Sequence, residues 1–412
     1  MAEPIDVVVV GSGPAGVAAA VALRRQGLRR VLLLEREDSA GGVPRHCGHP
    51  PFGMREFGRV CTGPAYARRL LDLAQQAGVE LHLRTTVLAL LPDAVLDIVS
   101  PAGRDRLQAR RVILATGVRE TPRSARLVSG DRPLGVINTG ALQAFVYLQG
   151  LVPFRRPVIV GTELVALSAL LTCRTAGIAP VALIESAARP STYWPCMLLP
   201  RLQGIAVHYG TQLLEIRGRQ RVESVLLQRA DGSQQDIACD GVLFTGCFVP
   251  EAALVRASHL ALADSTGGPQ VDQFGRCSDP RFFAAGNLLR PLETAGWSFR
   301  EGARIGQAVA ADLRGRLPGA QQPLTIECAQ GIRYVMPQLL SLPLGPYGLP
   351  ELQLRVGRAT RGLLTVSALG RQIWRQRLRS LPQRRILVPL RQLALPDGAS
   401  TLRIALSDSS DP

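Results

Sequence analysis

The chain has 412 residues and a formal net charge of +16 at pH 7, and all 48 of its Lys or Arg positions are arginine. This length predicts two or three domains rather than a single core. The arginines are spread along the sequence without a block of like charges, which argues against a nucleic-acid-binding protein. The absence of lysine excludes Schiff-base and pyridoxal-phosphate chemistry, because both require a lysine amine.

No targeting, membrane-spanning or metal-binding segment stands out in the sequence. An apolar run begins almost at once, which leaves no room for a signal peptide, and no apolar run is long enough for a transmembrane helix. We therefore expect a cytoplasmic protein without a membrane span. The eight cysteines form no Cys-x-x-Cys pair and no regular ligand spacing, so we expect no metal site and mostly reduced, buried thiols.

The first predicted element is the apolar run 5–10, IDVVVV, which is typical of a strand in a parallel sheet. It leads into Gly-Ser-Gly-Pro-Ala-Gly at 11–16 and then into an alanine-rich helical stretch. Glycines in this context make a tight turn, admit a pyrophosphate and let the helix pack on the strand. The next strand, VLLL, ends where a carboxylate can bind ribose hydroxyls. The predicted dinucleotide-binding residues of this region are Gly11, Gly13, Pro14, Ala15, Gly16, Glu35 and Gly42.

Further strands are predicted downstream of this first unit. The runs VELHLRTTVLALL, AVLDIVS and RDRLQARR indicate a meander between residues 79 and 111. The apolar strand 112–114 follows and ends in the small-residue turn Ala115-Thr116-Gly117. Much later, RFFAAGNLLR predicts a short strand ending at Gly286-Asn287, and a helix is predicted over 293–313.

A second strand, turn and helix pattern occupies 155–177 and is followed by an apolar strand that ends at Glu185. Its turn reads Gly-Thr-Glu-Leu-Val-Ala, so that Glu163 replaces the second glycine. A carboxylate at this position would crowd and repel a pyrophosphate. The turn is therefore poorly suited to NAD(H), and if a nucleotide does bind there, Glu185 favours NAD over NADP.

Between about 325 and 412, short alternating or apolar runs separated by Gly, Pro and Asp predict a small antiparallel β domain. In one run, Leu352, Leu354 and Val356 would point to one face of a strand, with Gln353 and Arg355 on the other. This domain could dock a partner or could simply cover the preceding domain, and both roles stay open.

The order of these motifs resembles the two-dinucleotide-binding-domain flavoproteins, the pyridine nucleotide-disulfide oxidoreductase-like family that includes the disulfide reductases. The resemblance implies FAD as cofactor, bound between the first glycine turn, a turn similar to Ala115-Thr116-Gly117 and a closing Gly-Asp turn. Asn287 departs from that aspartate, although an amide can still donate and accept hydrogen bonds; the alternative is a helix cap without a ligand. The resemblance adds to the cofactor site Thr116, Gly117, Gly286, Asn287 and Thr294.

The same resemblance implies an α/β fold with two Rossmann-like dinucleotide-binding domains and a small C-terminal β domain. The FAD-binding domain is expected to be discontinuous, at 1–125 and 255–322, with an NAD(P)-like domain inserted at 126–254. The C-terminal β-rich domain is expected at 323–412.

Segment 41–53, GGVPRHCGHPPFG, lies where the disulfide reductases carry two redox cysteines beside the flavin. Only Cys47 is present here, so a dithiol relay within the segment is excluded. We predict instead that the segment shapes the pocket beside the flavin ring, with His46, Cys47 and His49 as candidate catalytic residues and either histidine able to move a proton. A metal site would need further ligands that no second cluster supplies. The remaining alternative is that these side chains only satisfy backbone groups of the loop.

Segments 41–70, 129–150 and 284–302 are similar to one branch of this family. The branch comprises the flavoprotein subunits of hydrogen cyanide synthase, opine oxidase and dye-linked proline dehydrogenase, and the flavoproteins that accompany anaerobic glycerol-3-phosphate dehydrogenase. The resemblance implies an FAD-dependent oxidoreductase that carries electrons for a multicomponent dehydrogenase of a small amine, amino acid or glycerol-phosphate-type substrate. The expected partners are a small iron–sulfur protein and a second flavoprotein subunit. Two alternatives stay open: a free-standing NAD(P)H-dependent flavoprotein reductase, and a non-catalytic structural subunit.

Overall fold

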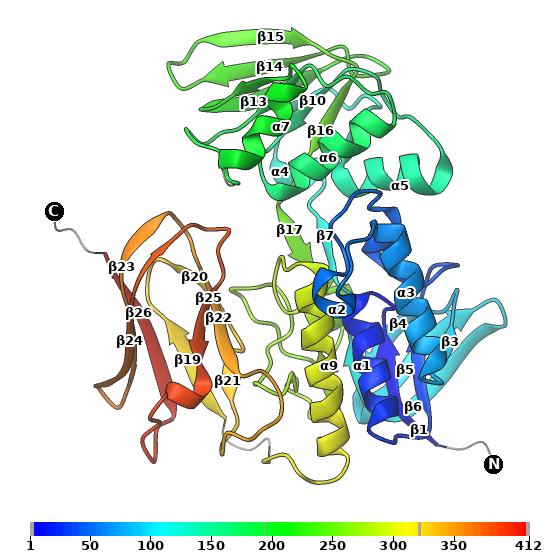
Figure 1. Cartoon of the computed structure of the whole chain (residues 1–412), viewed down its shortest axis with the longest axis vertical. Helices are drawn as coiled ribbons and strands as arrows, with labels where there is room; N and C mark the ends of the chain where they lie inside the picture. The colour runs from blue at the N-terminus through cyan, green and yellow to red at the C-terminus, as the bar shows by residue number, and fades with distance from the viewer. Residues whose placement is uncertain (1–3, 193, 320–322, 409–412) are drawn as a thin grey trace.

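The computed structural model describes residues 4–192, 194–319 and 323–408. The chain folds into three parts that Figure 1 separates by colour. The first part combines the blue N-terminal segment with the yellow α9, the second is the green part above it, and the C-terminal part is orange to red. The predicted domain ranges also include residues 1–3, 193, 320–322 and 409–412, which lie outside the described residues.

The first part is built on a parallel sheet whose central strand leads into the first glycine turn. Its strands, in spatial order, are β3 (Glu80–His82), β2 (Val31–Leu34), β1 (Ile5–Val10), β6 (Gly103–Leu114) and β18 (Phe282–Ala284). The predicted strand 5–10 is confirmed as β1, and its valines are buried on both faces of the sheet. Because β18 pairs with β6 in parallel, the turn after β18 lies at the same edge of the sheet as the first glycine turn.

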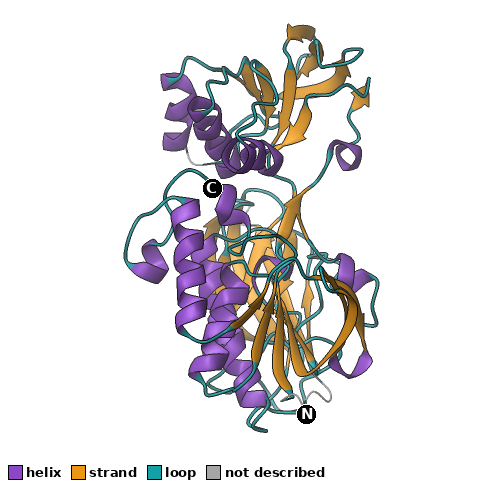
Figure 2. Cartoon of the chain, turned by 90° about the vertical axis from the view of Figure 1, so that its right-hand side faces the viewer, coloured by secondary structure: helices purple, strands orange, loops and turns teal. Residues whose placement is uncertain are grey.

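Three long helices, α1 (Pro14–Arg25), α3 (Gly63–Gln76) and α9 (Ala295–Asp312), pack together along one side of the strands (Figure 2). Helices α1 and α9 approach closely because α9 carries glycines at the contact. A Cβ at Gly302 would overlap the backbone of Ala15, and a Cβ at Gly306 would lie 2.5 Å from the carbonyl oxygen of Ala19. The predicted helix 293–313 is confirmed as α9, and its Gly302, in the second turn of the helix, packs against the start of α1.

The predicted meander consists of β4 (Thr86–Leu91), β5 (Val95–Ser100) and the first half of β6, paired antiparallel. The run 79–91 contributes to both sheets, since β3 extends the parallel sheet and β4 the meander. The runs 104–111 and 112–114 form one continuous strand, because the second half of β6 enters the parallel sheet.

The second part repeats the parallel design in the order β12 (Ala206–His208), β11 (Ala182–Ile184), β10 (Pro157–Val160), β16 (Gly241–Phe244) and β9 (Val136–Asn138). Its helices are α5 (Thr139–Gln149), α6 (Leu164–Thr175) and α7 (Leu198–Leu202). A second sheet contains β15 (Gln234–Ala238), β14 (Ser224–Arg229), β13 (Thr211–Arg217) and β8 (Ser129–Gly130). The paired strands β7 (Val118–Glu120) and β17 (Phe248–Pro250) lie between the two parts (Figure 1).

The C-terminal part contains two sheets packed around its own apolar core, as the alternating runs predict. One sheet has the order β21 (Leu339–Leu340), β19 (Leu324–Cys328), β26 (Thr401–Asp408), β23 (Thr360–Ala368) and β24 (Arg371–Ser380). The other has the order β20 (Ile332–Met336), β22 (Glu351–Val356) and β25 (Ile386–Pro389). All pairs are antiparallel except β19 with β26. The predicted fold class, two Rossmann-like units and a small C-terminal β domain, is confirmed.

The remaining elements are short. They are η1 (Val43–His46), α2 (Met54–Phe57), η2 (Pro92–Ala94), α4 (Arg123–Arg126), η3 (Trp194–Met197), α8 (Ala253–Arg256), η4 (Gly286–Leu288) and η5 (Leu390–Gln392).

All eight cysteines are free thiols, but only four of them are buried, so the expectation that most are buried is wrong. The four buried ones are Cys47, Cys173, Cys239 and Cys277. Among the described residues, no helix is both long and apolar enough to cross a membrane. The same residues contain no cluster of three or more His, Cys, Asp or Glu side chains suited to a metal ion.

Candidate functional site

The turn between β1 and α1 requires glycine at two positions for different reasons. Gly11 has a φ of +103°, and a Cβ there would lie 2.6 Å from the carbonyl oxygen of Ala115. A Cβ at Gly16 would overlap the carbonyl oxygen of Gly11, so glycine lets the helix approach the strand. These two residues therefore shape the turn itself.

Gly13 differs, because a Cβ at this position would meet no atom of the described residues within 4 Å. Gly13 is the N-cap of α1, where no side chain caps the free N–H groups and no acidic residue occupies the first turn. Open space beside an uncapped helix N-terminus suits the diphosphate of a dinucleotide. The residues present at this turn thus fit FAD.

Glu35 lies directly after β2 and is buried against the turn. Its Oε2 accepts hydrogen bonds from the backbone N–H of Ser12, at 3.1 Å, and from the Ser12 hydroxyl. The Ser12 hydroxyl in turn accepts from the Gly41 N–H at 3.1 Å, and a Cβ at Gly42 would lie 2.8 Å from the Cα of Gly13. Glu35 thereby links the glycine turn to the start of segment 41–53.

The second part repeats this hydrogen-bond pattern 150 residues later in the sequence. The hydroxyl of Thr162 donates to Oε2 of Glu185, and the Ser191 N–H donates to the Thr162 hydroxyl at 3.0 Å. Both units therefore share one hydrogen-bond pattern. In each, the hydroxyl of the residue after the first glycine of the turn donates to the glutamate that follows the second strand. The repeat identifies Glu163 as the counterpart of Gly13.

The side chain of Glu163 folds into its own turn. Its Oε2 accepts a hydrogen bond from the Thr245 hydroxyl at 2.8 Å, and its carboxylate is so close that a Cβ at Gly246 would lie 2.5 Å from its Oε1. Burial raises the pKa of this carboxyl above its ordinary value. The space that is open at Gly13 is thus occupied at Glu163.

The two other predicted turns lie around the first glycine turn. The Thr116 hydroxyl donates to the carbonyl oxygen of Glu251 at 2.8 Å, and Gly117 has a φ of +80° with open space at its Cβ position. Gly286 has a φ of +75°, and a Cβ there would lie 2.6 Å from the Cβ of Ala15. The turn after β18 therefore borders the start of α1.

Asn287 does not cap a helix, which removes that alternative from the sequence analysis. Its side-chain amide donates to the carbonyl oxygen of Glu293 at 3.0 Å and accepts from the Glu293 N–H at 2.8 Å. The N-cap of α9 is Thr294, whose side chain makes no capping hydrogen bond. Asn287 thus fixes the position of Glu293, the residue that directly precedes Thr294 and the N-terminus of α9.

The candidate catalytic residues do not form one cluster. His46 and Cys47 lie beside α5, where the Cys47 thiol donates to Oε1 of Gln143 at 3.4 Å. His49 is separate: its Nδ1 lies 2.9 Å from the Pro50 carbonyl oxygen, and its ring centroid is 5.6 Å from that of Phe52. Segment 41–53 therefore spans from the first glycine turn to the second part.

Burial changes the protonation of two of these groups. It lowers the pKa of His46 to about 4, with help from the Arg45 charge and against an opposing side-chain interaction with Gln143. The Nδ1 of His46 is buried without a hydrogen-bond partner among the described residues. Burial also raises the pKa of the Cys47 thiol to about 12, and the nearby Glu120 carboxylate adds to this. At neutral pH, His46 is therefore uncharged and Cys47 is a thiol.

Glu120, at the end of β7, is a buried carboxylate that the sequence analysis missed. It accepts hydrogen bonds from the N–H of Gly140 at 2.8 Å and from the N–H of Gly246 at 3.2 Å. Burial raises the pKa of Glu120 to about 7. A single glutamate in a short polar stretch carries no sequence signal, because its burial arises only when β7 meets the second part.

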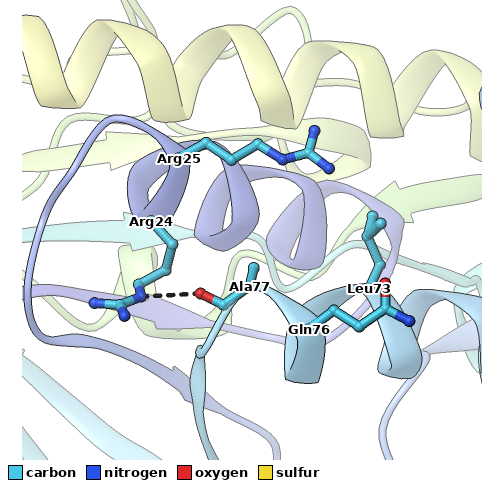
Figure 3. A pocket seen from close by; sticks show the side chains of 5 residues that line it. All are labelled: Arg24, Arg25, Leu73, Gln76 and Ala77. Carbon is cyan, nitrogen blue, oxygen red and sulfur yellow. Dashed lines mark hydrogen bonds between the residues drawn. The ribbon is translucent and has the colours of Figure 1, made fainter.

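A hollow at the opposite end of α1 is not part of this site. It is lined by Arg24, Arg25, Leu73, Gln76 and Ala77, and Nε of Arg24 donates to the Ala77 carbonyl oxygen at 3.1 Å (Figure 3). At a rise of about 1.5 Å per residue, the helix separates this hollow from the glycine turn by about 16 Å.

Comparison with known proteins identifies the family and supports the fold. The profile of the family described as "Pyridine nucleotide-disulphide oxidoreductase" matches residues 5–311. The alpha subunit of sarcosine oxidase from Rhizobium meliloti (strain 1021) is 28% identical over 82% of this chain and 33% of that protein. An opine oxidase subunit from Agrobacterium tumefaciens (strain Ach5) is 26% identical over 76% of this chain and 64% of that protein. This chain therefore spans less than two thirds of the length of either relative.

Among solved structures, the thioredoxin reductase of T. acidophilum has a TM-score of 0.64 and 22% identity, covering 76% of this chain and 99% of that chain. This likeness supports the fold. The family match ends at residue 311, before the C-terminal part begins. FAD is the cofactor of the family, so the predictions of an FAD cofactor and of an oxidoreductase are confirmed. Since the matched range covers most of the chain, the chain belongs to the pyridine nucleotide-disulphide oxidoreductase family.

Proposed function

We propose that this chain is the electron-carrying flavoprotein subunit of a multicomponent dehydrogenase that oxidises a small amine, amino acid or glycerol-phosphate-type substrate. The observation that carries the proposal is the position of the Glu163 carboxylate, which occupies the turn between β10 and α6 of the second part. A chain whose second turn cannot take NAD(P)H must exchange its electrons with something else. Relatives that are named as oxidase subunits support a partner protein in this role.

The first glycine turn would hold the cofactor. Gly13 and the N-terminus of α1 would bind the diphosphate, and Glu35 would face the adenosine ribose from the end of β2. Gly117 and Asn287 would border the remainder of the cofactor from the two neighbouring turns. When bound, FAD accepts a hydride at its N5 atom and passes the electrons on.

Segment 41–53 would form one wall of the reaction pocket. His46, uncharged at neutral pH, can accept a hydrogen bond at its unpartnered Nδ1 but is too weak a base to retain a proton. Cys47 keeps its proton, so it would contribute packing and a weak hydrogen bond rather than a nucleophile. We assign to His46 the role of orienting a substrate or partner group. His49 would lie on the outer side of the same segment, where its Nδ1 contacts the Pro50 carbonyl oxygen.

The expected partners are a second flavoprotein subunit, which would choose the substrate, and a small iron–sulfur protein. The described part of this chain offers no cysteine cluster of its own for an iron–sulfur centre. In this arrangement the chain would receive or deliver electrons through the flavin and leave substrate selection to its partner.

The test is an absorbance spectrum of the purified protein, followed by anaerobic addition of NADH and, separately, NADPH. We expect a yellow protein whose flavin is not bleached by either nucleotide but is bleached by photochemical reduction. Rapid bleaching by NADH or NADPH would overturn the proposal in favour of a free-standing reductase. A colourless protein that does not take up added FAD would overturn it in favour of a structural subunit.

A further inference from the structure

Strand β22, in the C-terminal part, alternates apolar and polar residues, yet both of its faces are buried. Leu352 and Leu354 point into the core of this part, as predicted. Gln353 and Arg355 point the other way and are nevertheless only 7% and 9% exposed. An alternating strand normally turns its polar face to water. Here that polar face lies against residues 286–301 of the first part.

Gln353 adds one hydrogen-bond partner to a buried ion pair in the first part. Arg290 is 1% exposed and Glu301 4%, and their side chains bond twice, at 2.7 and 3.0 Å. Oε1 of Gln353 accepts from Nη2 of Arg290 at 2.9 Å. Each polar partner matters at a desolvated ion pair, because a buried charged group without partners is costly, and Nε of Arg290 already lacks one among the described residues. The same Glu301 carboxylate accepts the N–H of Gly286 at 2.8 Å, so the pair holds the turn that follows β18.

Arg355 holds the next stretch of the same loop. Its Nη2 donates to the Leu292 carbonyl oxygen at 2.6 Å and to Oε1 of Glu293 at 3.0 Å. Two further side chains of the C-terminal part act on this loop: the Tyr334 hydroxyl donates to the Pro291 carbonyl oxygen at 3.1 Å, and Arg385 donates to Oε2 of Glu293 at 3.0 Å. Residues 291–293 are therefore held one after another by the C-terminal part.

These contacts reach the cofactor site through Asn287. Its amide is bonded to both backbone groups of Glu293, so the position of Glu293 determines where Asn287 and the following Thr294 lie. The loop also touches the first glycine turn, because Gly286 packs against Ala15. A displacement at residues 291–293 would therefore move the wall of the FAD site.

We propose that Gln353 and Arg355 are positioning residues for FAD, and that the polar face of β22 clamps the loop 286–294 against the first glycine turn. This inference rests on the FAD site of the proposed function. It assigns the C-terminal part, which lies beyond the family match, a role in the cofactor site itself. Of the two roles that the sequence leaves open, this proposal gives covering a specific form, and docking of a partner stays a separate prediction.

The experiment compares FAD binding in matched variants of the full chain. Arg355→Met and Gln353→Leu remove the polar contacts with little change in side-chain length, and Arg355→Lys restores the charge. Arg377→Met and Gln376→Leu make the same changes on exposed residues of β24 in the same part. Each apoprotein is titrated with FAD by fluorescence, and the flavin absorption bands and midpoint potential of each holoprotein are recorded.

We expect Arg355→Met and Gln353→Leu to raise the dissociation constant of FAD about tenfold, which is the lower end of the loss seen when supporting contacts around metal ligands are removed. The flavin bands and midpoint potential should shift as well, Arg355→Lys should recover part of both effects, and the β24 controls should match wild type. A folded Arg355→Met protein with wild-type affinity and flavin bands would overturn the proposal, and so would equal losses in the controls.

If Arg355→Met or Gln353→Leu does not fold, Tyr334→Phe provides the test instead. This variant removes only the hydroxyl that bonds the Pro291 carbonyl oxygen, so it should fold. The loss of one hydrogen bond should weaken FAD binding by about two- to fivefold, and unchanged binding would count against the proposal. Bleaching of the wild-type flavin by NADH would contradict the proposed function while leaving this comparison of FAD affinities intact, so the two failures are distinguishable.

Discussion

The carboxylate of Glu163 accepts a hydrogen bond from the Thr245 hydroxyl at 2.8 Å, inside the turn that corresponds to the first glycine turn. The two turns share their hydroxyl-to-carboxylate bond and their sequence spacing, and they differ in what stands at the point of closest approach to a ligand. Gly13 leaves that space open, whereas Glu163 fills it with a buried carboxylate. The difference between Gly13 and Glu163 at this one position thus makes the first turn suited to a diphosphate and the second turn unsuited to it.

Replacing Glu163 by glycine should open the second turn. We expect Glu163→Gly to bind NADH at least about tenfold more tightly than wild type, which corresponds to about 1.4 kcal/mol of removed crowding and repulsion. The measurement is a fluorescence titration with NADH, followed by anaerobic mixing to see whether the flavin is reduced. Glu163→Gln keeps the volume but removes the charge, and it should remain close to wild type because the space stays filled. Equal NADH binding in all three proteins would contradict this account.

A side chain at Gly13 should block FAD without disturbing the fold. Gly13 has a φ of −69°, so Leu can adopt its backbone conformation, and a Cβ there meets no atom within 4 Å in the part of the chain that the structure describes. We expect Gly13→Leu to purify without flavin and to melt like the wild-type apoprotein. The control is Gly345→Leu, since Gly345 also has open space and lies in the C-terminal part. Full flavin content in Gly13→Leu would place the diphosphate elsewhere.

The buried carboxyl of Glu120 should make stability depend on pH. Its pKa is raised from 4.5 to about 7 in the folded protein, so the folded state favours the protonated form. The contribution of the Glu120 carboxyl to the free energy of unfolding is fully present below pH 4.5, and it is lost as pH rises through about 7. Relative to Glu120→Gln, wild type should lose up to about 3 kcal/mol between pH 5 and 8. Urea unfolding of both proteins at each pH measures this; parallel pH profiles would show that Glu120 does not titrate as described.

The thiol of Cys47 should be unreactive at neutral pH. Burial raises its pKa to about 12, three units above the ordinary value of 9.0, which lowers the thiolate fraction about a thousandfold. We expect iodoacetamide to label the exposed Cys247 long before Cys47, as followed by mass spectrometry of the native protein. Cys47→Ser should retain the flavin and its spectrum. Labelling of Cys47 at a rate similar to that of Cys247 would reopen a nucleophilic role for this residue.

The first glycine turn could be predicted from the sequence because its determinants are local. The apolar run 5–10, the glycine spacing and the acid after the next strand all lie within 31 residues of chain, and β1 and α1 form where they were expected. Glu163 was recognised in the same way, as a departure from a short pattern. In both cases neighbouring residues along the chain decide the conformation.

The network around Arg290 could not be predicted in this way. Its members, Glu301 and Gln353, lie 11 and 63 residues further along the chain, and each has an ordinary local sequence. The alternation in β22 indicated which side chains share a face, but it could not show that the polar face is buried. That outcome depends on the packing of the C-terminal part against the first part.

The sequence by itself determined the two Rossmann-like units, the small β domain and the glycine turn that suits FAD, because hydrophobic periodicity and glycine conformation act over short stretches of chain. Only the tertiary structure decided where Glu120 is buried, how His46 and His49 are separated, and that β22 supports the cofactor loop. Burial, desolvation and long-range hydrogen bonds arise when distant segments meet, and no single segment carries their signature.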